Sequence, residues 1–459
     1  MKTKFIFITF FLCMIFLIFG TIINVPDDYA TIQSAINASS TGDTILVQPG
    51  TYHENVDFNN RAVTLASLYA TTSDESYIES TIINGGHSSS CVKFDSGEGN
   101  DSVINGFTVT NGYAYYGAGI YCYNSSSPTI MNMIIDNNDG HPDDSYGGGI
   151  CIMSESEPVC SNIVISNNYA EAGGGIYCHD NGNATLSNIT FFGNTANHGG
   201  AMLTNYSHPV VDRALVYDNQ ANSAGGAVYV LYHSFPEFTN CSIVNNTTPG
   251  WGGGFYCNDI YGEPIITNSI IWGNESDYDL QIFALGANPT VNYSDVQDGT
   301  GEDWFGEGCI DADPLFLDPG NDIFFLTVSS PCIDAGDPNS PLDPDGSIAD
   351  MGVFYFEQTD VNNEELINNN ERIEISNYPN PFHSSTTISF SVTQTSRFVT
   401  LDIYNLKGQK IRQFSIDDSR FSIVWDGTDE TGKYVSSGIY YYKMKNGRYT
   451  STKKMILMK

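Results

Sequence analysis

The sequence predicts an all-β protein in which a parallel β-helix is followed by a small β-sandwich. Two observations predict the parallel β-helix. A glycine before a short apolar run recurs with steps of 30, 26, 25, 26 and 28 residues, at positions 119, 149, 175, 200, 226 and 254, and two sets of asparagines keep the same rhythm. A fixed period of this size is typical of a solenoid. The third observation is a C-terminal region of short strand-like runs separated by glycine turns, which predicts the sandwich.

Each repeat of the solenoid contains three short apolar runs bounded by Gly and Asn, for example at residues 175–178, 184–186 and 189–192. Runs this short, rich in Ile, Val, Thr, Tyr and Phe, predict strands rather than helices. Three strands and their tight turns in one repeat predict one coil of a parallel β-helix. We expect roughly ten coils over residues 40–300, stacked about 4.8 Å apart.

The two sets of polar residues are expected to mark the bends of the coils. Asparagine suits a bend because it tolerates left-handed backbone conformations and hydrogen-bonds to its own backbone. Stacked asparagines can also bond to each other from coil to coil. The first set is Asn138, Asn168, Asn194, Asn219, Asn246 and Asn274, and the second is Asn132, Asn162, Asn188, Asp212, Asn240 and Asn268.

Residues 1–20 predict a secretory signal peptide, because Lys2 and Lys4 precede an apolar run over residues 5–19. This run is too short to predict a membrane span, and no later stretch is apolar enough to cross a bilayer. We therefore expect no transmembrane span in the mature chain. Helical spacing of apolar residues over 27–36 predicts a short helix that covers the open end of the solenoid.

The stretch over residues 25–67, with its strand and turn at 43–52, resembles the start of secreted right-handed β-helix proteins of the pectin-lyase-like superfamily. The resemblance continues through residues 104–109 and the Gly/Asn repeats. It implies a right-handed β-helix over residues 21–300. Residues 311–316 and 330–338 resemble the segment that closes the C-terminal end of such proteins, which implies a closing segment over residues 301–358.

Residues 359–376 predict a linker, since 361–370 are polar, acidic and rich in Asn. Residues 377–459 predict the separate small β-sandwich. Alternation along its strands predicts a core made by Leu401, Ile403, Val424, Ile439 and Tyr441.

The motifs at residues 377–382, 401–408, 425–427, 437–442 and 453–455 resemble the type A C-terminal sorting domain of the type IX secretion system, which is related to an Ig-like module. The resemblance implies that the type IX secretion machinery is a partner. It also implies export through the periplasm and across the outer membrane, removal of the domain, and a final location at the outer cell surface or outside the cell.

Charge divides the chain at the same place. Residues 371–459 hold 13 Lys+Arg and 8 Asp+Glu, a net charge of +5, and the remainder holds 18 − 13 = 5 basic and 53 − 8 = 45 acidic residues, a net charge of −40. Nucleic acid is excluded as a partner, because binding it requires basic side chains that neutralise phosphates. Anionic surfaces are disfavoured for the same reason. Divalent cations and neutral glycans remain open as partners.

Nine cysteines follow the predicted signal peptide. Cys122, Cys178 and Cys257 share one phase of the repeat, so we expect them to pack inward as small apolar side chains. Cys309 and Cys332 fall in the closing segment, where a disulfide and two free thiols are equally compatible with an exported protein.

Arg213 and Asp212 are the candidate catalytic residues. Resemblance to polysaccharide lyases of this fold, which use calcium on Asp clusters and an Arg or Lys base, implies that Arg213 would remove a sugar C5 proton. In the alternative, Asp212 replaces an asparagine of the second set and Arg213 points to solvent. We favour this alternative, because a fold that hosts many functions lends little support to any one of them.

A candidate calcium site follows in the closing segment, where oxygen-bearing side chains alternate at short spacing and a glycine follows Asp345, as in calcium-binding loops. The EF-hand pattern is not complete. The alternative is a set of turns in which the carboxylates cap backbone groups. The candidate ligands are Asp337, Asn339, Asp343, Asp345 and Asp350.

The sequence leaves two function classes. The first is a non-catalytic protein of the cell surface or the extracellular medium, with a role in adhesion, glycan contact or surface structure. The second is a calcium-dependent polysaccharide lyase or a glycoside hydrolase. We favour the first, since the sequence shows no full catalytic set.

Overall fold

The structure is a computed structural model that describes residues 20–142, 144–258, 261–278, 281–356, 373–392, 399–405, 410–416, 422–446 and 449–457. The predicted signal peptide therefore lies outside the described residues except for its last one. The chain divides into two compact units, residues 1–358 and 359–459. No helix in the described ranges is long and apolar enough to span a membrane.

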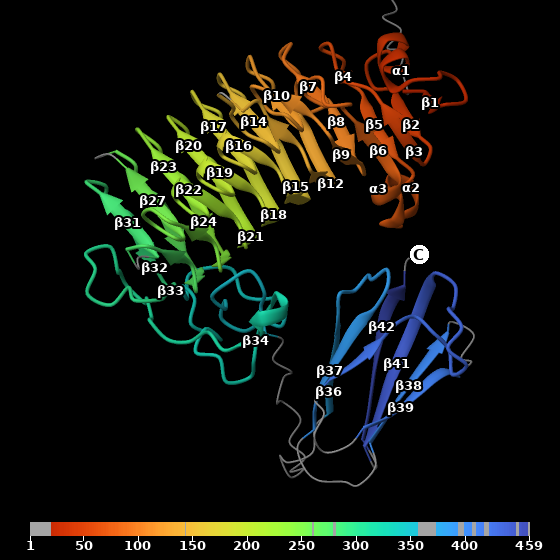
Figure 1. Cartoon of the computed structure of the whole chain (residues 1–459), viewed down its shortest axis with the longest axis vertical. Coiled ribbons are helices and arrows are strands. Elements are labelled where there is room, and N and C mark those ends of the chain that lie inside the picture. The colour runs from red at the N-terminus through yellow and green to blue at the C-terminus, as the bar shows by residue number, and fades with distance from the viewer. Residues whose placement is uncertain are drawn as a thin grey trace, which may run out of the picture. The chain divides into compact units, whose positions relative to one another are not determined.

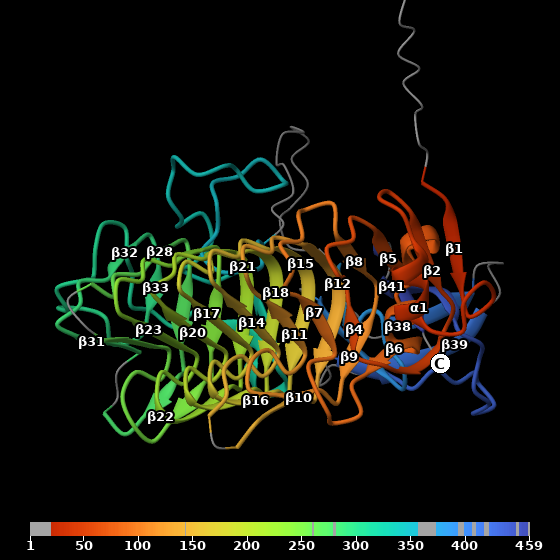
Figure 2. The ribbon, with the colours of Figure 1, turned by 90° about the horizontal axis from the view of Figure 1, so that it is seen from above.

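The first unit is a stack of β coils, which confirms the predicted parallel β-helix (Figures 1 and 2). Its largest sheet has 17 strands in the described residues. They are β1 (Ile22–Val25), β2 (Thr44–Val47), β3 (Gly50–His53), β5 (Thr64–Ser67), β6 (Thr81–Asn84), β8 (Val103–Asn105), β9 (Thr108–Thr110), β12 (Thr129–Asp136), β15 (Val159–Ser166), β18 (Thr185–Phe192), β21 (Val210–Tyr217), β24 (Glu237–Thr239), β25 (Ser242–Val244), β28 (Ile265–Thr267), β29 (Ile270–Trp272), β32 (Thr290–Asn292) and β33 (Asp295–Val296).

Two further sheets complete the coils. The nine-stranded sheet contains β4 (Val56–Asp57), β7 (Val92–Phe94), β11 (Ile120–Cys122), β14 (Ile150–Met153), β17 (Ile176–His179), β20 (Met202–Asn205), β23 (Val228–Leu231), β27 (Phe255–Asn258) and β31 (Ile282–Leu285). The seven-stranded sheet contains β10 (Tyr113–Ala114), β13 (Asp139–Gly140), β16 (Tyr169–Ala172), β19 (Thr195–His198), β22 (Gln220–Ala224), β26 (Thr247–Thr248) and β30 (Glu275–Ser276).

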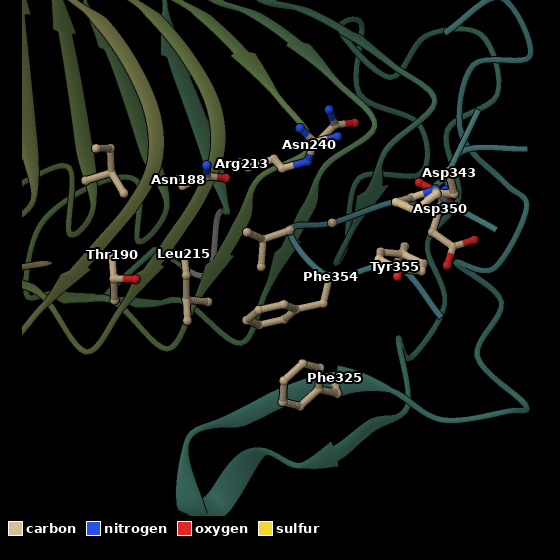
Figure 3. A pocket seen from close by; sticks show the side chains of 14 residues that line it. Asn188, Thr190, Arg213, Leu215, Asn240, Phe325, Asp343, Asp350, Phe354 and Tyr355 are labelled. Atoms are coloured by element: carbon tan, nitrogen blue, oxygen red, sulfur yellow. The ribbon is translucent and has the colours of Figure 1, made fainter. Parts of the chain in front are cut away.

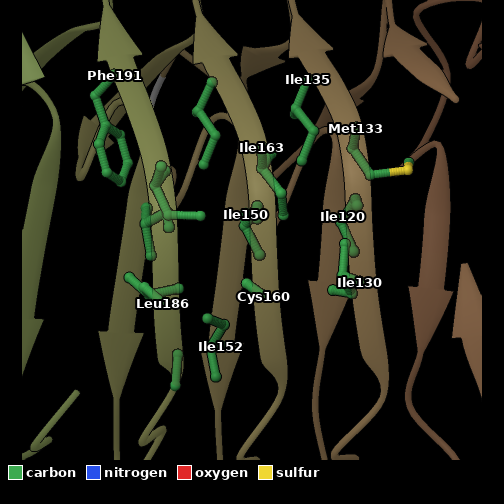
Figure 4. Packing of buried hydrophobic residues seen from close by; sticks show 14 of the residues in the cluster. Ile120, Ile130, Met133, Ile135, Ile150, Ile152, Cys160, Ile163, Leu186 and Phe191 are labelled. Atoms are coloured by element: carbon green, nitrogen blue, oxygen red, sulfur yellow. The ribbon is translucent and has the colours of Figure 1, made fainter. Parts of the chain in front are cut away.

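Parallel pairing keeps each side chain above its counterpart in the neighbouring coil. Ile150 pairs with Ile176 across β14 and β17, and Ile163 pairs with Ile189 across β15 and β18. The inward side chains of facing sheets therefore meet in one continuous apolar core (Figure 4). Cys122, Cys178 and Cys257 lie fully buried in this core, as the repeat predicts.

The first asparagine set forms a buried ladder. Each member donates both its backbone N–H and its Nδ2–H to the side-chain oxygen of the next member. Asn168 donates to Asn194 Oδ1 over 3.1 and 3.0 Å, and Asn194 donates to Asn219 Oδ1 over 3.1 and 2.9 Å. The ladder begins at Asn138 and passes from Asn274 to Gln281.

Asn194→Ala is expected to destabilise the solenoid by about 2–4 kcal/mol, because buried donors of Asn168 and the carbonyl of Ile165 lose their partner. Asn222→Ala is the matched control, since Asn222 makes one exposed bond to Asn197. This control should cost under about 0.5 kcal/mol. Chemical denaturation followed by circular dichroism measures both. Equal losses in the two variants would contradict a stabilising role for the buried ladder.

Helix α1 (Ile32–Ala38) covers the N-terminal end of the core with its buried residues Ile32, Ala35 and Ile36. Thr31 caps the helix, and the Glu54 carboxylate accepts hydrogen bonds from the backbone N–H groups of Ile32 and Gln33 over 2.9 Å each. Two short helices, α2 (Tyr69–Thr72) and α3 (Ser76–Ser80), follow β5 and precede β6.

The closing segment after β33 contains the hairpin β34 (Phe316–Asp318) and β35 (Ile323–Leu326), with the 3₁₀ turn Pro319–Asn321 between them. It then packs back onto the largest sheet. Gly352 N donates to Asn268 O over 2.8 Å, and a Cβ on Gly352 would lie 2.8 Å from Ile270 Cδ1. Glycine is required there by this close approach and by a φ of +102°.

Cys309 and Cys332 are free thiols, so the disulfide alternative is wrong. Each thiol instead makes its own hydrogen bond to the last coil. Cys309 Sγ lies 3.3 Å from Val291 O, and Cys332 Sγ lies 3.2 Å from Asp295 Oδ2.

The second unit consists of two antiparallel sheets. One contains β36 (Ile373–Tyr378), β37 (Thr386–Val392) and β40 (Ser422–Trp425), and the other contains β38 (Val399–Asn405), β39 (Lys410–Ile416), β41 (Gly438–Asn446) and β42 (Tyr449–Leu457). The first strand begins at Ile373, inside the segment predicted as a linker.

Leu401 and Ile403 are buried in the core of this unit, as predicted. Val424 and Tyr441 are 59% and 38% exposed, so the prediction is wrong for these two. Their neighbours face the core instead, which puts β40 and β41 in the opposite alternation phase. The side chain of Ile439 lies outside the described residues. The buried residues on these two strands are Ile423, Trp425, Tyr440, Tyr442 and Met444.

Candidate functional site

The outer side of the nine-stranded sheet carries an unusual set of side chains. In β11, Ile120 and Cys122 point into the core and Tyr121 points outward. In-register pairing repeats this outward position on each coil. The outward row from β11 to β31 is Tyr121, Cys151, Tyr177, Leu203, Tyr229, Tyr256 and Phe283.

Aromatic rings border this row on the side where the coil enters the sheet. Tyr116 stacks on Tyr146 with ring centroids 5.5 Å apart, and Trp251 stacks on Tyr278 at 5.1 Å. Both pairs also contact the outward row, since Tyr146 lies 4.9 Å from Tyr177. The Trp251 ring lies 6.4 Å from Tyr256.

A second border lies where the coil leaves the sheet. Tyr206 contacts His179 at 6.4 Å and His233 at 5.6 Å, and His233 stacks on Tyr261 at 4.3 Å with the planes 11° apart. We call the outward row and its two borders the aromatic face. The border residues are Tyr116, Tyr146, Trp251 and Tyr278 on one side and Tyr123, His179, Tyr206, His233 and Tyr261 on the other.

The borders of the aromatic face are open to solvent, with Tyr206, Tyr261 and Tyr278 exposed by 46%, 45% and 55%. Two hydroxyls of the face, those of Tyr146 and Tyr177, have a raised pKa. A hydrogen bond from Tyr146 to Asp144 raises the pKa of this tyrosine to about 12, and burial raises the pKa of Tyr177 further. The borders therefore offer flat apolar ring surfaces and hydroxyl groups to solvent, whereas Tyr177, Tyr229 and Tyr256 of the outward row are buried.

Arg213 and Asp212 lie on β21, in the largest sheet rather than on the aromatic face. Arg213 Nη1 forms a 3.3 Å ion pair with Asp212 Oδ2, and Asp212 Oδ1 accepts a hydrogen bond from Asn240. Strand register pairs Asp212 with Ser187, one position before Asn188. Arg213 therefore occupies the asparagine position of the second set, with a left-handed φ of 56° against 54° for Asn188. The expectation that Asp212 replaces an asparagine is wrong for the backbone position, although the Asp212 carboxylate accepts the ladder hydrogen bond of Asn240.

The candidate calcium ligands make turns with the backbone. Asp337 Oδ1 accepts from the backbone and side chain of Asn339, and Asp345 Oδ1 accepts from both donors of Ser347. Asp343 Oδ2 accepts from the backbone N–H of Asp350 over 2.8 Å. These contacts match the alternative of capped turns.

In the part of the chain that the structure describes, no group of three or more His, Cys, Asp or Glu side chains has the geometry of a metal site. Amide and backbone oxygens, which calcium also accepts, lie outside that criterion. Calcium binding by Asp337, Asn339, Asp343, Asp345 and Asp350 therefore stays a prediction.

The structure brings Arg213 together with two of these carboxylates. Arg213, Asp343 and Asp350 line one cavity of about 540 Å³, although Arg213 is more than a hundred residues from either carboxylate in the sequence. The remaining three calcium candidates do not line it.

The aromatic face was not predicted from the sequence, although its pattern was present there. A tyrosine or other apolar side chain follows the first inward residue of each repeat, at positions 121, 177, 229 and 256. Two adjacent phases of apolar residues in a short strand mean that both sides of the sheet are apolar.

Comparison with known proteins adds two family matches. The family described as "Right handed beta helix region" matches residues 143–257 and 174–309, and the family "Secretion system C-terminal sorting domain" matches residues 376–458. No match was found among curated protein sequences.

Three solved structures show partial similarity. Dimeric latent PorU from Porphyromonas gingivalis is 22% identical over 18% of this chain, with a TM-score of 0.17, and the chain spans 9% of the PorU length. Pectin methylesterase in complex with hexasaccharide VII and a pectin methylesterase mutant in complex with hexasaccharide IV are 9% and 10% identical to this chain. Each matches 63% of this chain and 92% of its own length, with TM-scores of 0.32 and 0.30.

Proposed function

We propose that this right-handed β-helix protein, which a C-terminal sorting domain directs to the cell surface or the extracellular space, is a non-catalytic binding protein for neutral glycans. The type IX secretion machinery handles the sorting domain during export. The glycan is bound on the aromatic face, in a role of adhesion or surface structure.

The observation that carries this proposal is the run of exposed rings along the second border, where Tyr206, His233 and Tyr261 lie on successive coils. Sugar rings present flat C–H surfaces that stack on Tyr and Trp, while their hydroxyls bond to the polar tips of the same side chains. The coils repeat the same side-chain position about every 4.8 Å. A linear glycan laid along the solenoid would therefore meet a ring on several successive coils.

The charge of the chain favours a neutral glycan. The solenoid and its flanking segments carry the net charge of −40 derived above from 5 basic and 45 acidic residues. A field of this sign repels polyanionic glycans over about a Debye length, roughly 10 Å in 0.1 M salt.

Binding is tested with the purified full-length protein and neutral polysaccharides, such as β-glucan and xylan, in affinity electrophoresis. We expect retardation by at least one of them. The double variant Trp251→Ala/Tyr278→Ala should weaken this binding at least tenfold, because it removes one stacked, exposed pair. Tyr29→Ala is the matched control, since Tyr29 is exposed but lies outside the aromatic face.

Equal retardation of the parent chain and the double variant would contradict the proposal.

The alternative, a calcium-dependent lyase or glycoside hydrolase, is tested on the same polysaccharides and on pectins. Release of reducing ends or of unsaturated products is measured with and without calcium. We expect no turnover. Turnover that disappears in Arg213→Ala would favour the alternative.

A further inference from the structure

A cavity of about 540 Å³ lies between the outer side of the largest sheet and the closing segment. Thr190 and Leu215 of β18 and β21 form its floor. One wall is the bend row Asn188, Arg213 and Asn240, as Figure 3 shows. Asp350, residues 352–355 and Phe325 of β35 lie across from it.

The second polar ladder is interrupted at this wall. Asn162 donates to Asn132 and Asn188 donates to Asn162, so that each amide oxygen is taken by the next coil. The coil after Asn188 carries Arg213 in this position, and arginine has no acceptor and a different shape. Among the described residues, the amide oxygen of Asn188 is therefore left without a ladder donor at the edge of the cavity.

Arg213 adopts the same left-handed backbone as its asparagine neighbours, with a φ of 56°. This conformation costs an arginine roughly 1 kcal/mol more than it costs asparagine or glycine. Its guanidinium has five N–H donors, of which one bonds to Asp212. The other donors are available to a ligand, since the side chain is 51% exposed and lines the cavity.

The acidic groups of the cavity have different roles. Both oxygens of Asp350 are used, by the backbone N–H groups of Asp334 and Phe356 over 2.7 and 2.6 Å. Asp343 uses Oδ2 for the backbone of Asp350, which leaves Oδ1 as an acceptor at the cavity wall. Burial raises the pKa of Asp343, and the nearby Arg213 opposes this shift.

The opposite part of the cavity is apolar. The rings of Phe325 and Phe354 pack against each other with centroids 4.3 Å apart, and Leu215 and Val353 lie beside them. A ligand in this cavity therefore meets aromatic carbon on one side and converging polar groups on the other, an arrangement typical of small-molecule sites of this size.

We propose that this cavity binds a neutral saccharide of one or two sugar units, held by Arg213, Asn188 and Asp343 and packed against Phe354. A sugar hydroxyl both donates and accepts, so neighbouring hydroxyls can donate to Asp343 Oδ1 and to the oxygen of Asn188 while they accept from the guanidinium. An anion would face the carboxylates of Asp343 and Asp350. A cation would face Arg213.

The inference goes beyond the aromatic face, because the cavity lies on a different sheet and shares no residue with it. The aromatic face takes an extended polymer by stacking, whereas the cavity takes a short end group by hydrogen bonds. Failure of either one leaves the other intact.

The test is isothermal titration calorimetry, supported by saturation-transfer NMR, on the full-length protein. The probes are glucose, galactose, mannose, N-acetylglucosamine and their disaccharides, with glucuronate and glucosamine as charged counterparts. We expect at least one neutral sugar to bind with a dissociation constant of about 1 mM or lower. The charged counterparts should bind at least tenfold more weakly.

Arg213→Asn is the decisive variant. It restores the asparagine of the ladder and suits the left-handed backbone, so it should fold at least as well as the parent chain. It should nevertheless weaken sugar binding at least tenfold. Phe354→Ala should weaken it as well, and Trp251→Ala/Tyr278→Ala should leave it unchanged.

Three outcomes would overturn the inference. The first is that no neutral sugar in the panel binds, or that only a charged one does. The second is that Arg213→Asn binds as tightly as the parent chain. The third is that the double variant on the aromatic face loses the sugar, which would place the bound sugar there.

Discussion

Removal of residues 373–459 is expected to leave the solenoid folded and to stop its export. The two units have separate hydrophobic cores, one spanning the coils and one holding Trp425 and Tyr442. Each unit therefore has the hydrophobic core that it needs to fold without the other. The cut is placed at Ile373 because β36 begins there. Without its sorting domain the protein should be retained inside the cell envelope.

Fractionation of the native host with an antibody against the solenoid measures this effect. The full-length chain should reach the surface or the medium, in a mature form that we expect to have lost the sorting domain. Val424→Ala is the control within that domain, since its side chain is exposed and its loss leaves the core unchanged. Truncated protein at the cell surface would contradict the prediction.

The second large effect concerns Asp295, which is fully buried under the closing segment. Its carboxylate accepts from the backbone of Ala312 and from the Cys332 thiol. Burial raises the pKa of Asp295 to about 7 from the ordinary 3.8. The folded state thus holds a proton that the unfolded chain releases above pH 4.

The sign of the pH dependence follows from this difference. The stabilising contribution is full below pH 3.8 and is lost as the pH rises through 7, the folded pKa. Each pKa unit corresponds to about 1.4 kcal/mol, so the protein should lose about 4 kcal/mol of stability between pH 4 and pH 8, of which roughly 3 kcal/mol falls between pH 5 and pH 8. Asp295→Asn should remove most of this loss, because an amide keeps the acceptor for Ala312 without a charge.

Thermal unfolding at pH 5 and pH 8 provides the measurement, with Glu302→Gln as the control. That change removes an exposed carboxylate from the same segment. The parent chain and the control should lose stability in parallel as the pH rises. If Asp295→Asn loses as much as they do, the buried carboxyl is not the cause.

Much of the solenoid could be predicted because each coil has the same packing requirements as the previous one. A side chain that points inward in one coil must do so in the next, so a period in the sequence becomes a stack in space. The phase of one residue was nevertheless misread. Both the glycine marker, from 175 to 200, and the ladder marker, from 194 to 219, step by 25 residues there. The same step from Asn188 leads to Arg213, not to Asp212.

The cavity could not be predicted in this way. It forms because a non-repeating segment returns to β18 and β21 from far along the chain, and periodicity says nothing about where such a segment settles. The core of the second unit was difficult to predict for a different local reason. Tyr440, Tyr441 and Tyr442 follow each other, so alternation alone does not fix which of them face inward.

The buried ladder has a direction, and this direction bears on how such a protein changes its length in evolution. Every coil requires an acceptor from the coil that follows, and Gln281 supplies the last one while its Nε2 bonds back to Asn274 O. Gln281 thus ends the ladder, and its side-chain oxygen could accept from any coil that has an asparagine at the position of Asn274. Duplication of one internal coil in the gene would insert a unit that already donates and accepts in the correct sense. We expect lineages of this protein to differ by whole coils upstream of Gln281, with both ends unchanged.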